Sequence, residues 1–405
     1  MWMLPYEGRH VPHVVVEVNQ RCNITCAACY KDRFGLQKPL DEVRADIDLA
    51  CSLRDLSALT LAGGEPTLHP DLPEIVRYVA SKGIAPHILT NGHALDPALL
   101  GRLREAGLSE LFVHVDGMQT RPDLPKEATE AERNAFRARI AKLVTDHGIR
   151  CSMIITLYKR HLGNLPEIVE FILRDPNVCR LLVTCYNDFH AIASGFSSTE
   201  VLGRTYERPP VERTVWMNAA EKLTGEAVTL GEVRSALADR FGMEPFGAVG
   251  SSLDPEAVRW IVYYAFSIHG SRERTLALSP AFARIASRVY ARARRKGKPY
   301  SFGGVPSGLR AVLACVAYAV ATLSVREAWR VAGFLMNLLR PGTTIRHKGF
   351  TFQEGPRLTA DGRIDYCRDC PDATIREGGL VPVCLSDILA PLPKGAPRTE
   401  LTPVP

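Results

Sequence analysis

Residues 14–30 read VVVEVNQRCNITCAACY, and residues 59–66 read LTLAGGEP. Each stretch is a short aliphatic run that ends in residues capable of chemistry. The first ends in three cysteines with the spacing C-x3-C-x2-C, and the second ends in a Gly-Gly-Glu-Pro turn. Short apolar runs of this kind are typical of buried parallel strands. Because α/β sheets carry their sites at the C-terminal ends of the strands, the two motifs are predicted to lie close together.

The same alternation of strand and helix patterns continues as far as residue 185. Amphipathic segments that end at glycines separate further apolar runs at residues 88–90, 111–115, 153–157 and 181–184. Six strands with helical crossovers predict an α/β fold, a six-stranded partial (β/α)6 barrel that is two strands short of a closed eight-fold barrel. We expect this barrel over residues 12–190 and a mostly helical substrate-side region over 191–345, in which 254–268 is a helix. A small cysteine-rich extension is expected over 346–390, followed by a disordered tail over 391–405.

The composition is that of a globular protein. Of the 405 residues, 46% are hydrophobic and 23% are charged, which excludes a largely disordered chain. The N-terminus lacks the features of a secretory signal and no apolar run is long enough to span a bilayer, so we expect a cytoplasmic protein. A net charge of +6 gives little reason to expect nucleic-acid binding. Without a secretory signal, the eleven cysteines favour metal or redox sites over a disulfide framework.

The first cysteine loop has the donor set of an iron–sulfur cluster. Thiolates from Cys22, Cys26 and Cys29 can bind three irons of a cubane cluster and leave the fourth iron open to chelate another ligand. A zinc site completed by a distant histidine is the alternative. In the second motif, the two glycines allow another backbone to approach closely, and the glutamate can hold the strand edge in place.

Together, the C-x3-C-x2-C loop after the first strand and the GGEP turn after the second resemble the paired signature of the radical S-adenosylmethionine (SAM) enzymes. The resemblance covers roughly residues 12–190. It implies a 4Fe–4S cluster on the three cysteines, SAM bound to the open iron, and an electron donor such as flavodoxin or ferredoxin. It also implies reductive cleavage of SAM to a 5′-deoxyadenosyl radical that abstracts hydrogen from an unactivated C–H bond. The family commonly has an aromatic residue before the third cysteine. Here that residue is Ala28, with Tyr30 just after the cysteine, and we expect the change to alter adenine packing rather than cluster ligation.

The resemblance also implies roles for residues at the next strand ends. Gly63, Gly64 and Glu65 would contact the amino group of the SAM methionine. The residues that end the third and fourth strands point into the same mouth, and Asp116 would bind a ribose hydroxyl or substrate. His114 either faces the lumen or is a satisfied core histidine. The cofactor-binding candidates are therefore Gly63, Gly64, Glu65, Thr90, Asn91, His114 and Asp116.

A second cysteine group lies near the C-terminus. Cys367 and Cys370 form a C-x2-C pair, and Cys384 follows downstream. The group resembles the extensions that bind a second iron–sulfur cluster in many radical SAM enzymes, although it has fewer cysteines than the seven-cysteine (SPASM) type. A zinc knuckle is the alternative. The candidates for a fourth ligand are Cys315, Cys185 and His347.

The middle region contains a basic segment followed by an apolar one. Residues 284–298 hold seven basic side chains and no acidic one, and residues 311–323 carry no charge. We expect a solvated basic face over a buried apolar helix. The alternatives are contact with a membrane surface, or the wall of a channel for a greasy substrate.

The sequence supports hypotheses from two classes of protein. The leading hypothesis is a radical SAM enzyme with an auxiliary cluster that acts on a lipid or another apolar small molecule. The alternative within this chemistry is a maturase of a ribosomally made peptide. The alternative of another class is a non-catalytic zinc-binding structural protein.

Overall fold

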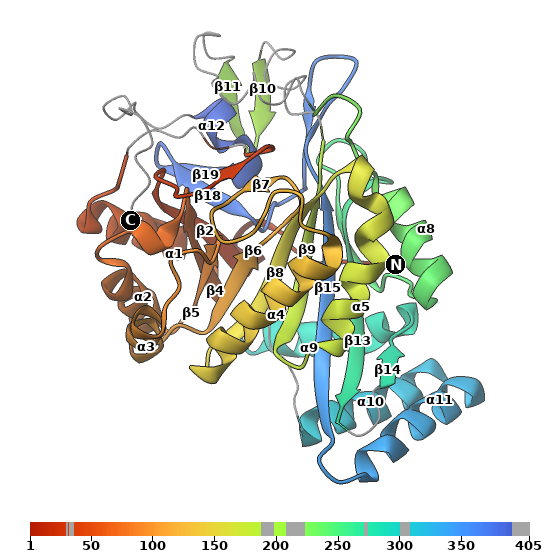
Figure 1. Ribbon diagram of the computed structural model, residues 1–405. Helices are drawn as coiled ribbons and strands as arrows, with labels where there is room; N and C mark the ends of the chain where they lie inside the picture. Colours follow the sequence, from red (N-terminus) through yellow and green to blue (C-terminus); the bar gives the residue numbers. More distant parts are fainter. Residues whose placement is uncertain are drawn as a thin grey trace.

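The computed structural model describes residues 1–29, 31, 36–187, 198–207, 223–270, 274–299 and 308–390. Tyr30 and the tail from residue 391 lie outside the described residues. Six parallel strands stand side by side in the order β2-β4-β5-β6-β8-β9 within a larger sheet (Figure 1). The six-stranded α/β prediction is confirmed. The strands are β2 (His13–Asn19), β4 (Ala58–Gly63), β5 (Ala85–Thr90), β6 (Glu110–His114), β8 (Arg150–Leu157) and β9 (Val178–Cys185).

Five helices connect the parallel strands and share one hydrophobic core with them. Their start signals are local. Asp96 Oδ1 accepts a hydrogen bond from Leu99 N at 2.6 Å at the start of α3, and Thr129 and Glu132 form a capping box at the start of α4. The helices are α1 (Leu40–Leu53), α2 (Leu72–Ser81), α3 (Pro97–Glu105), α4 (Glu130–Asp146) and α5 (Leu165–Arg174).

The sheet continues beyond β9 with strands from the rest of the chain. β15 (Thr344–Glu354) pairs with β9 in parallel, and β13 (Val258–His269) pairs antiparallel with β15. The edge is completed by β12 (Gly247–Gly250), β1 (Trp2–Met3) and β14 (Arg274–Ala277). The prediction of a helix over 254–268 is wrong, because most of this segment is β13. Its β-branched and aromatic side chains are buried along nearly the whole strand, as in a central strand covered on both faces.

Among the described residues of the middle region, helices make up most of the remaining regular structure. α8 (Leu230–Phe241) packs against α5. α10 (Leu309–Thr322) packs against β15, α11 (Val325–Leu335) packs against β14, and α9 (Ala283–Arg295) packs against α10. The expectation of a buried apolar helix over 311–323 is wrong for one of its faces. Ala311, Cys315 and Tyr318 are buried, but the opposite side chains of α10 are exposed. Among the described helices, none is long and apolar enough to cross a bilayer.

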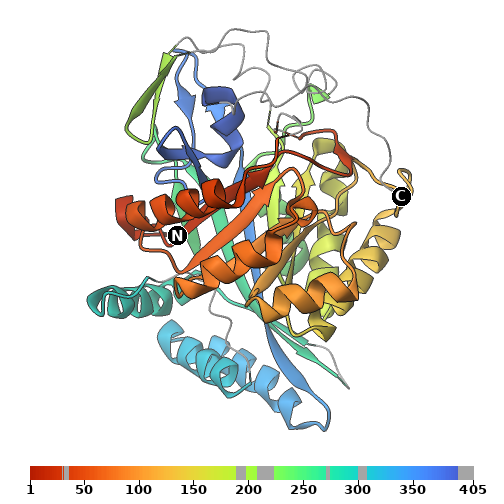
Figure 2. The ribbon, with the colours of Figure 1, turned by 90° about the vertical axis from the view of Figure 1, so that its left-hand side faces the viewer.

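The C-terminal extension folds back along β2 (Figures 1 and 2). It contains two small hairpins, β16 (Arg357–Leu358) with β17 (Ile364–Asp365) and β18 (Ala373–Arg376) with β19 (Gly379–Pro382), and it ends in α12 (Ser386–Leu389). Its apolar residues share a core with a further hairpin, β10 (Ser198–Val201) with β11 (Arg204–Glu207). Since β15 belongs to the main sheet, the extension begins after Glu354 rather than at residue 346.

Buried ion pairs fasten the extension to the first cysteine loop. Glu17 on β2 pairs with Lys31, just after the loop, and with Arg376 on β18. Asp387 on α12 lies 3.1 Å from Arg376 and 3.6 Å from Lys31. All four side chains are almost completely buried. Charges so deeply buried must be paired, so this network requires the extension to sit over the loop.

Candidate functional site

A cavity lies at the C-terminal ends of the parallel strands, where the sequence predicts the site. Both cysteine groups line it, although more than 330 positions separate them in the chain. The predicted residues that line this mouth cavity are Cys22, Cys26, Cys29, Gly63, Gly64, Asn91, His114, Cys367, Cys370 and Cys384.

The GGEP turn binds the backbone that leads into the cysteine loop. Gly64 N donates to Asn19 O at 2.9 Å, and Glu65 N donates to Arg21 O at 2.6 Å. A Cβ at Gly64 would lie 2.6 Å from Gln20 O and closer still to Arg21 O. Gly63 has φ +144° and faces Asn19 O just as closely. No side chain fits at either position without moving the segment before Cys22.

Glu65 lies behind the mouth cavity and does not line it. Its carboxylate accepts hydrogen bonds from Thr90 Oγ1 at 2.7 Å, Asn91 N at 2.7 Å and Thr67 N at 3.0 Å. Burial raises the pKa of Glu65, and these hydrogen bonds oppose the rise. Glu65 and Thr90 thus join the end of β4 to the end of β5, whereas the adjacent glycines face the mouth cavity.

Asn91 contacts the first cysteine directly. Its Nδ2 lies 3.7 Å from Cys22 Sγ and donates to Asn23 Oδ1 at 2.7 Å. The side chain therefore holds the start of the cysteine loop and places an amide N–H beside a thiol that is a candidate cluster ligand.

His114 lines the mouth cavity and also has polar partners, so it has features of both possibilities left by the sequence. Its Nε2 lies 2.8 Å from Asp116 Oδ2. Asp116 is buried and does not line the mouth cavity. Burial works to raise the pKa of Asp116, but the contact with His114 and other hydrogen bonds lower it overall. Asp116 thus orients the His114 ring toward the cavity.

Sequence reasoning missed two tyrosines of the mouth cavity. Tyr158 and Tyr186 stack with ring centroids 5.4 Å apart, and both pack in a small cluster with Ala28. Each follows directly on a strand, β8 and β9 respectively. Their position directly after predicted strands was the feature of the sequence that could have identified them as site residues. The two rings pack beside Ala28, the position before the third cysteine at which radical SAM enzymes commonly have an aromatic residue.

The first cysteine group fits a cubane cluster by its donor chemistry and its setting. Cys22, Cys26 and Cys29 are half-buried, line one cavity, and lie beside a backbone cradle that excludes side chains. None of the eleven cysteines, all of them described, is in a disulfide. Within the described residues, no three His, Cys, Asp or Glu side chains are gathered around the position of a single metal ion. In a cubane cluster each thiolate binds a different iron.

The second cysteine group lines the mouth cavity from the extension. Trp260 Nε1 donates to Cys367 Sγ at 3.0 Å, and Arg54 donates to the carbonyl oxygen of Cys370 at 2.9 Å. Contact with Cys367 and burial raise the pKa of the Cys370 thiol. None of the three fourth-ligand candidates lines the mouth cavity. Cys315 lies on α10, Cys185 at the end of β9 and His347 on β15, whereas Asp372 does line it.

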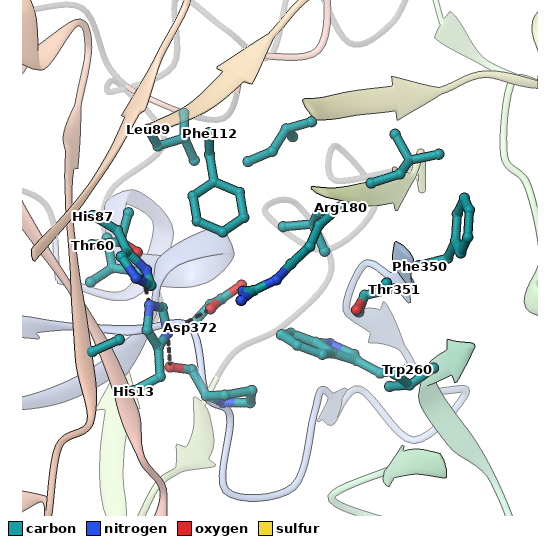
Figure 3. Close-up of a pocket in the computed structure, with 18 of the residues that line it drawn as sticks. His13, Thr60, His87, Leu89, Phe112, Arg180, Trp260, Phe350, Thr351 and Asp372 are labelled. Atoms are coloured by element: carbon teal, nitrogen blue, oxygen red, sulfur yellow. Dashed lines mark hydrogen bonds and ion pairs between the residues drawn. The ribbon is translucent and has the colours of Figure 1, made fainter. Parts of the chain in front are cut away.

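A second cavity continues from the mouth toward the N-terminal ends of the strands (Figure 3). This lower cavity shares Val15, Leu89, Ile154, Leu182, Trp260 and Asp372 with the mouth cavity. Most of its walls are apolar, and Arg180 reaches into it (Figure 3). At its polar end, His13 Nε2 lies 2.8 Å from Thr60 Oγ1, and His13 Nδ1 lies 3.1 Å from Asp372.

Three comparisons relate the chain to known proteins. Residues 16–172 match the model of the radical SAM superfamily. Fe-coproporphyrin III synthase of Methanosarcina barkeri is 30% identical over 185 residues, which make up 44% of this chain and 45% of that protein. PqqA peptide cyclase of Granulibacter bethesdensis is 24% identical over 161 residues, or 39% of this chain and 42% of that protein. The crystal structure of Streptococcus suis SuiB bound to S-adenosylmethionine aligns with a TM-score of 0.36 and 18% identity, over 57% of this chain and 48% of that one.

The chain spans about half the length of the curated relatives it matches. The matched segment contains the cysteine loop, the GGEP turn and the first five parallel strands almost entirely. Residues 16–172 are therefore a radical SAM domain.

Proposed function

We propose that the protein is an enzyme that reductively cleaves SAM and removes hydrogen from a C–H bond of its substrate. The observation that carries this proposal is that Cys22, Cys26 and Cys29 share one cavity with the Gly63–Gly64 cradle at the strand ends. When bound, a 4Fe–4S cluster with SAM supplies one-electron cleavage of the sulfonium and the radical chemistry that follows.

The surrounding side chains have defined tasks in this proposal. The three thiols hold the cluster, and the backbone of Gly63 and Gly64 faces the methionine portion of SAM. Asn91 donates toward Cys22, and Asp116 keeps the His114 ring turned to the mouth cavity. The tyrosine pair closes the mouth beside Ala28 and keeps water from the reacting groups.

The relatives favour a peptide as the substrate class. One of them is named a peptide cyclase, and this supports the maturase hypothesis over the lipid hypothesis. The mouth cavity adjoins the lower cavity through shared lining residues, and the two together would give room for a chain that enters beside the cysteines. The lower cavity is also the specific observation that favours a second candidate, an apolar small molecule, because its walls are mostly aliphatic and aromatic.

We also propose that Cys367, Cys370 and Cys384 hold a second iron–sulfur cluster across the mouth cavity from the first. The N–H of Trp260 beside Cys367 and the charge of Arg54 near Cys370 would both stabilise thiolate ligands there. Asp372 lies two residues after Cys370 and lines the same cavity, so we include it as a candidate fourth ligand.

Iron and zinc content of anaerobically reconstituted protein tests both cluster proposals. Wild type is expected to be brown and to lose about half its iron when Cys367, Cys370 and Cys384 are all changed to alanine, as two clusters of equal size require. The triple variant should still cleave SAM, because the first site keeps its ligands. Colourless protein with zinc would contradict both cluster proposals, and unchanged iron in the triple variant would contradict the second.

A further inference from the structure

Three helices, α9, α10 and α11, carry an exposed surface that the proposed chemistry does not use. We call them the basal helices. α10 and α11 lie at the end of the molecule opposite the C-terminal extension, and α9 packs against α10 (Figures 1 and 2). We propose that the basal helices bind the surface of an anionic lipid bilayer.

The apolar part of this surface is a continuous helical stripe. Successive exposed positions on α10 and just after it are three or four residues apart, so they share one face of the helix. The face opposite, with Cys315 and Tyr318, packs onto the protein. The exposed side chains are Leu309 (73% exposed), Leu313 (59%), Val316 (45%), Val320 (68%) and Leu323 (85%).

The stripe continues into α11 and the turn that follows it. Val325 and Trp329 are each 75% exposed, and Met336 and Leu339 are 67% and 82% exposed. Scattered apolar residues are normal on protein surfaces, but here nine exposed ones are concentrated on two adjacent helices and the turn after them. A large patch of this kind marks a surface that is covered by a partner or a membrane.

The charge of the same region is strongly positive. Residues 283–340 contain eleven Lys and Arg and one acidic residue, Glu327. Since the whole chain has a net charge of only +6, the rest of the chain is net negative. Glu327 is already engaged, because Tyr318 OH donates to its Oε2 at 2.9 Å and Arg330 lies 2.6 Å from its Oε1. The basic side chains of α9 and the turn after it are exposed, namely Arg284, Arg288, Arg292, Arg294, Arg295, Lys296 and Lys298.

An anionic bilayer matches both properties of the surface. Head groups attract the basic side chains while the acyl region accepts the aliphatic stripe, and Trp329 has the amphipathic ring typical of membrane interfaces. α10 has 14 residues, which is too short to span a bilayer, so it would lie along the surface. A second copy of this chain is a poor occupant, because face-to-face pairing would bring two strongly positive surfaces together.

Flotation of the full-length protein with vesicles tests the proposal. The vesicles are phosphatidylcholine with or without phosphatidylglycerol, at low and high salt. We expect wild type to float with the anionic vesicles at low salt, and to float much less at high salt or with phosphatidylcholine alone. Leu313→Asp combined with Val320→Asp should weaken partitioning by more than about tenfold, since two apolar anchors are lost.

A pair of charge-reversal variants distinguishes binding through the basic side chains of α9 from a nonspecific effect of the protein's overall charge. Arg288→Glu with Arg292→Glu on α9 should weaken binding by more than about tenfold. The matched control is Arg77→Glu with Arg102→Glu, exposed positions on α2 and α3, and it should bind almost as wild type does. All these positions are exposed, so circular dichroism of each variant should match that of wild type.

Three results would overturn the proposal. The first is wild type that stays unbound with anionic vesicles at low salt. The second is equal binding by the Leu313→Asp/Val320→Asp variant. The third is a wild-type dimer by light scattering that this variant dissociates, because a second copy would then cover the stripe. None of these readouts depends on SAM cleavage, so they are independent of the proposed activity.

Discussion

Gly64→Ala isolates the role of the glycine cradle from every side-chain effect. The added Cβ would lie 2.6 Å from Gln20 O and from the Arg21 carbonyl carbon, and closer to Arg21 O. The obstacle is backbone, so relief requires the segment before Cys22 to move away from β4. Overpacking costs about 1–3 kcal/mol and loss of the Gly64 N to Asn19 O hydrogen bond about 1 kcal/mol more. We therefore expect unfolding free energy to fall by about 2–4 kcal/mol.

The assay pairs urea unfolding of the apoprotein with iron content after anaerobic reconstitution. Because the displaced segment leads directly into Cys22, Gly64→Ala should also lose cluster iron at the first site. Gly101→Ala on α3 is the matched control, since nothing lies within 4 Å of its added Cβ. It should stabilise the helix by about 0.5–1 kcal/mol and leave iron unchanged. Wild-type stability and iron in Gly64→Ala would refute the role assigned to this glycine.

Three further predictions concern the surroundings of the two cysteine groups. Arg376→Met leaves Glu17 and Asp387 with one fewer buried partner and should lower the unfolding free energy by about 3–5 kcal/mol. Faster proteolysis of the extension is the second readout. Unchanged proteolysis would contradict the role of Arg376 in holding the extension to the barrel. Burial tends to raise the pKa of Glu17, but Lys31 and Arg376 hold this pKa well below its usual value of 4.5. The stability that Glu17 contributes is therefore complete above pH 4.5 and is lost as the pH falls below it. Urea unfolding across this pH range should show a smaller loss of stability in acid for Glu17→Gln than for wild type. Asn91→Ala removes the N–H beside Cys22 and should make the reduction potential of the first cluster more negative. Redox titration followed by electron paramagnetic resonance measures this potential. An unchanged potential would show that Asn91 does not influence the cluster.

The strand ends of the barrel could be predicted because their information is local. The β-branched runs, the helix-ending glycines and the spacing of Cys22, Cys26 and Cys29 all lie within short windows of sequence. The role of Glu65 could not be predicted in the same way, because its partners Thr90 and Asn91 come from the next strand. Its neighbours in the GGEP turn face the mouth cavity, while its own side chain turns away.

Long-range pairing accounts for most of what the sequence did not reveal. The extension reaches the mouth cavity because β15 pairs with β9 and returns the chain to the barrel. Glu17, Lys31 and Arg376 then join three distant segments. The aromatic run of β13 was misassigned because apolar runs that are buried on both faces lack the alternation that distinguishes a strand from a helix. The exposed stripe of α10 was missed for a related reason, because an uncharged helix is normally buried and exposure is not visible in composition.

Formation of 5′-deoxyadenosine is the most direct test of whether Cys22, Cys26 and Cys29 hold a radical SAM cluster. Anaerobically reconstituted wild type, given dithionite and SAM, should release 5′-deoxyadenosine and methionine even without its substrate. Cys26→Ala should release none, while Cys51→Ala, a half-buried cysteine on α1 that lines neither cavity, should match wild type. Product formation by Cys26→Ala at the wild-type rate would contradict the assignment of this cysteine group.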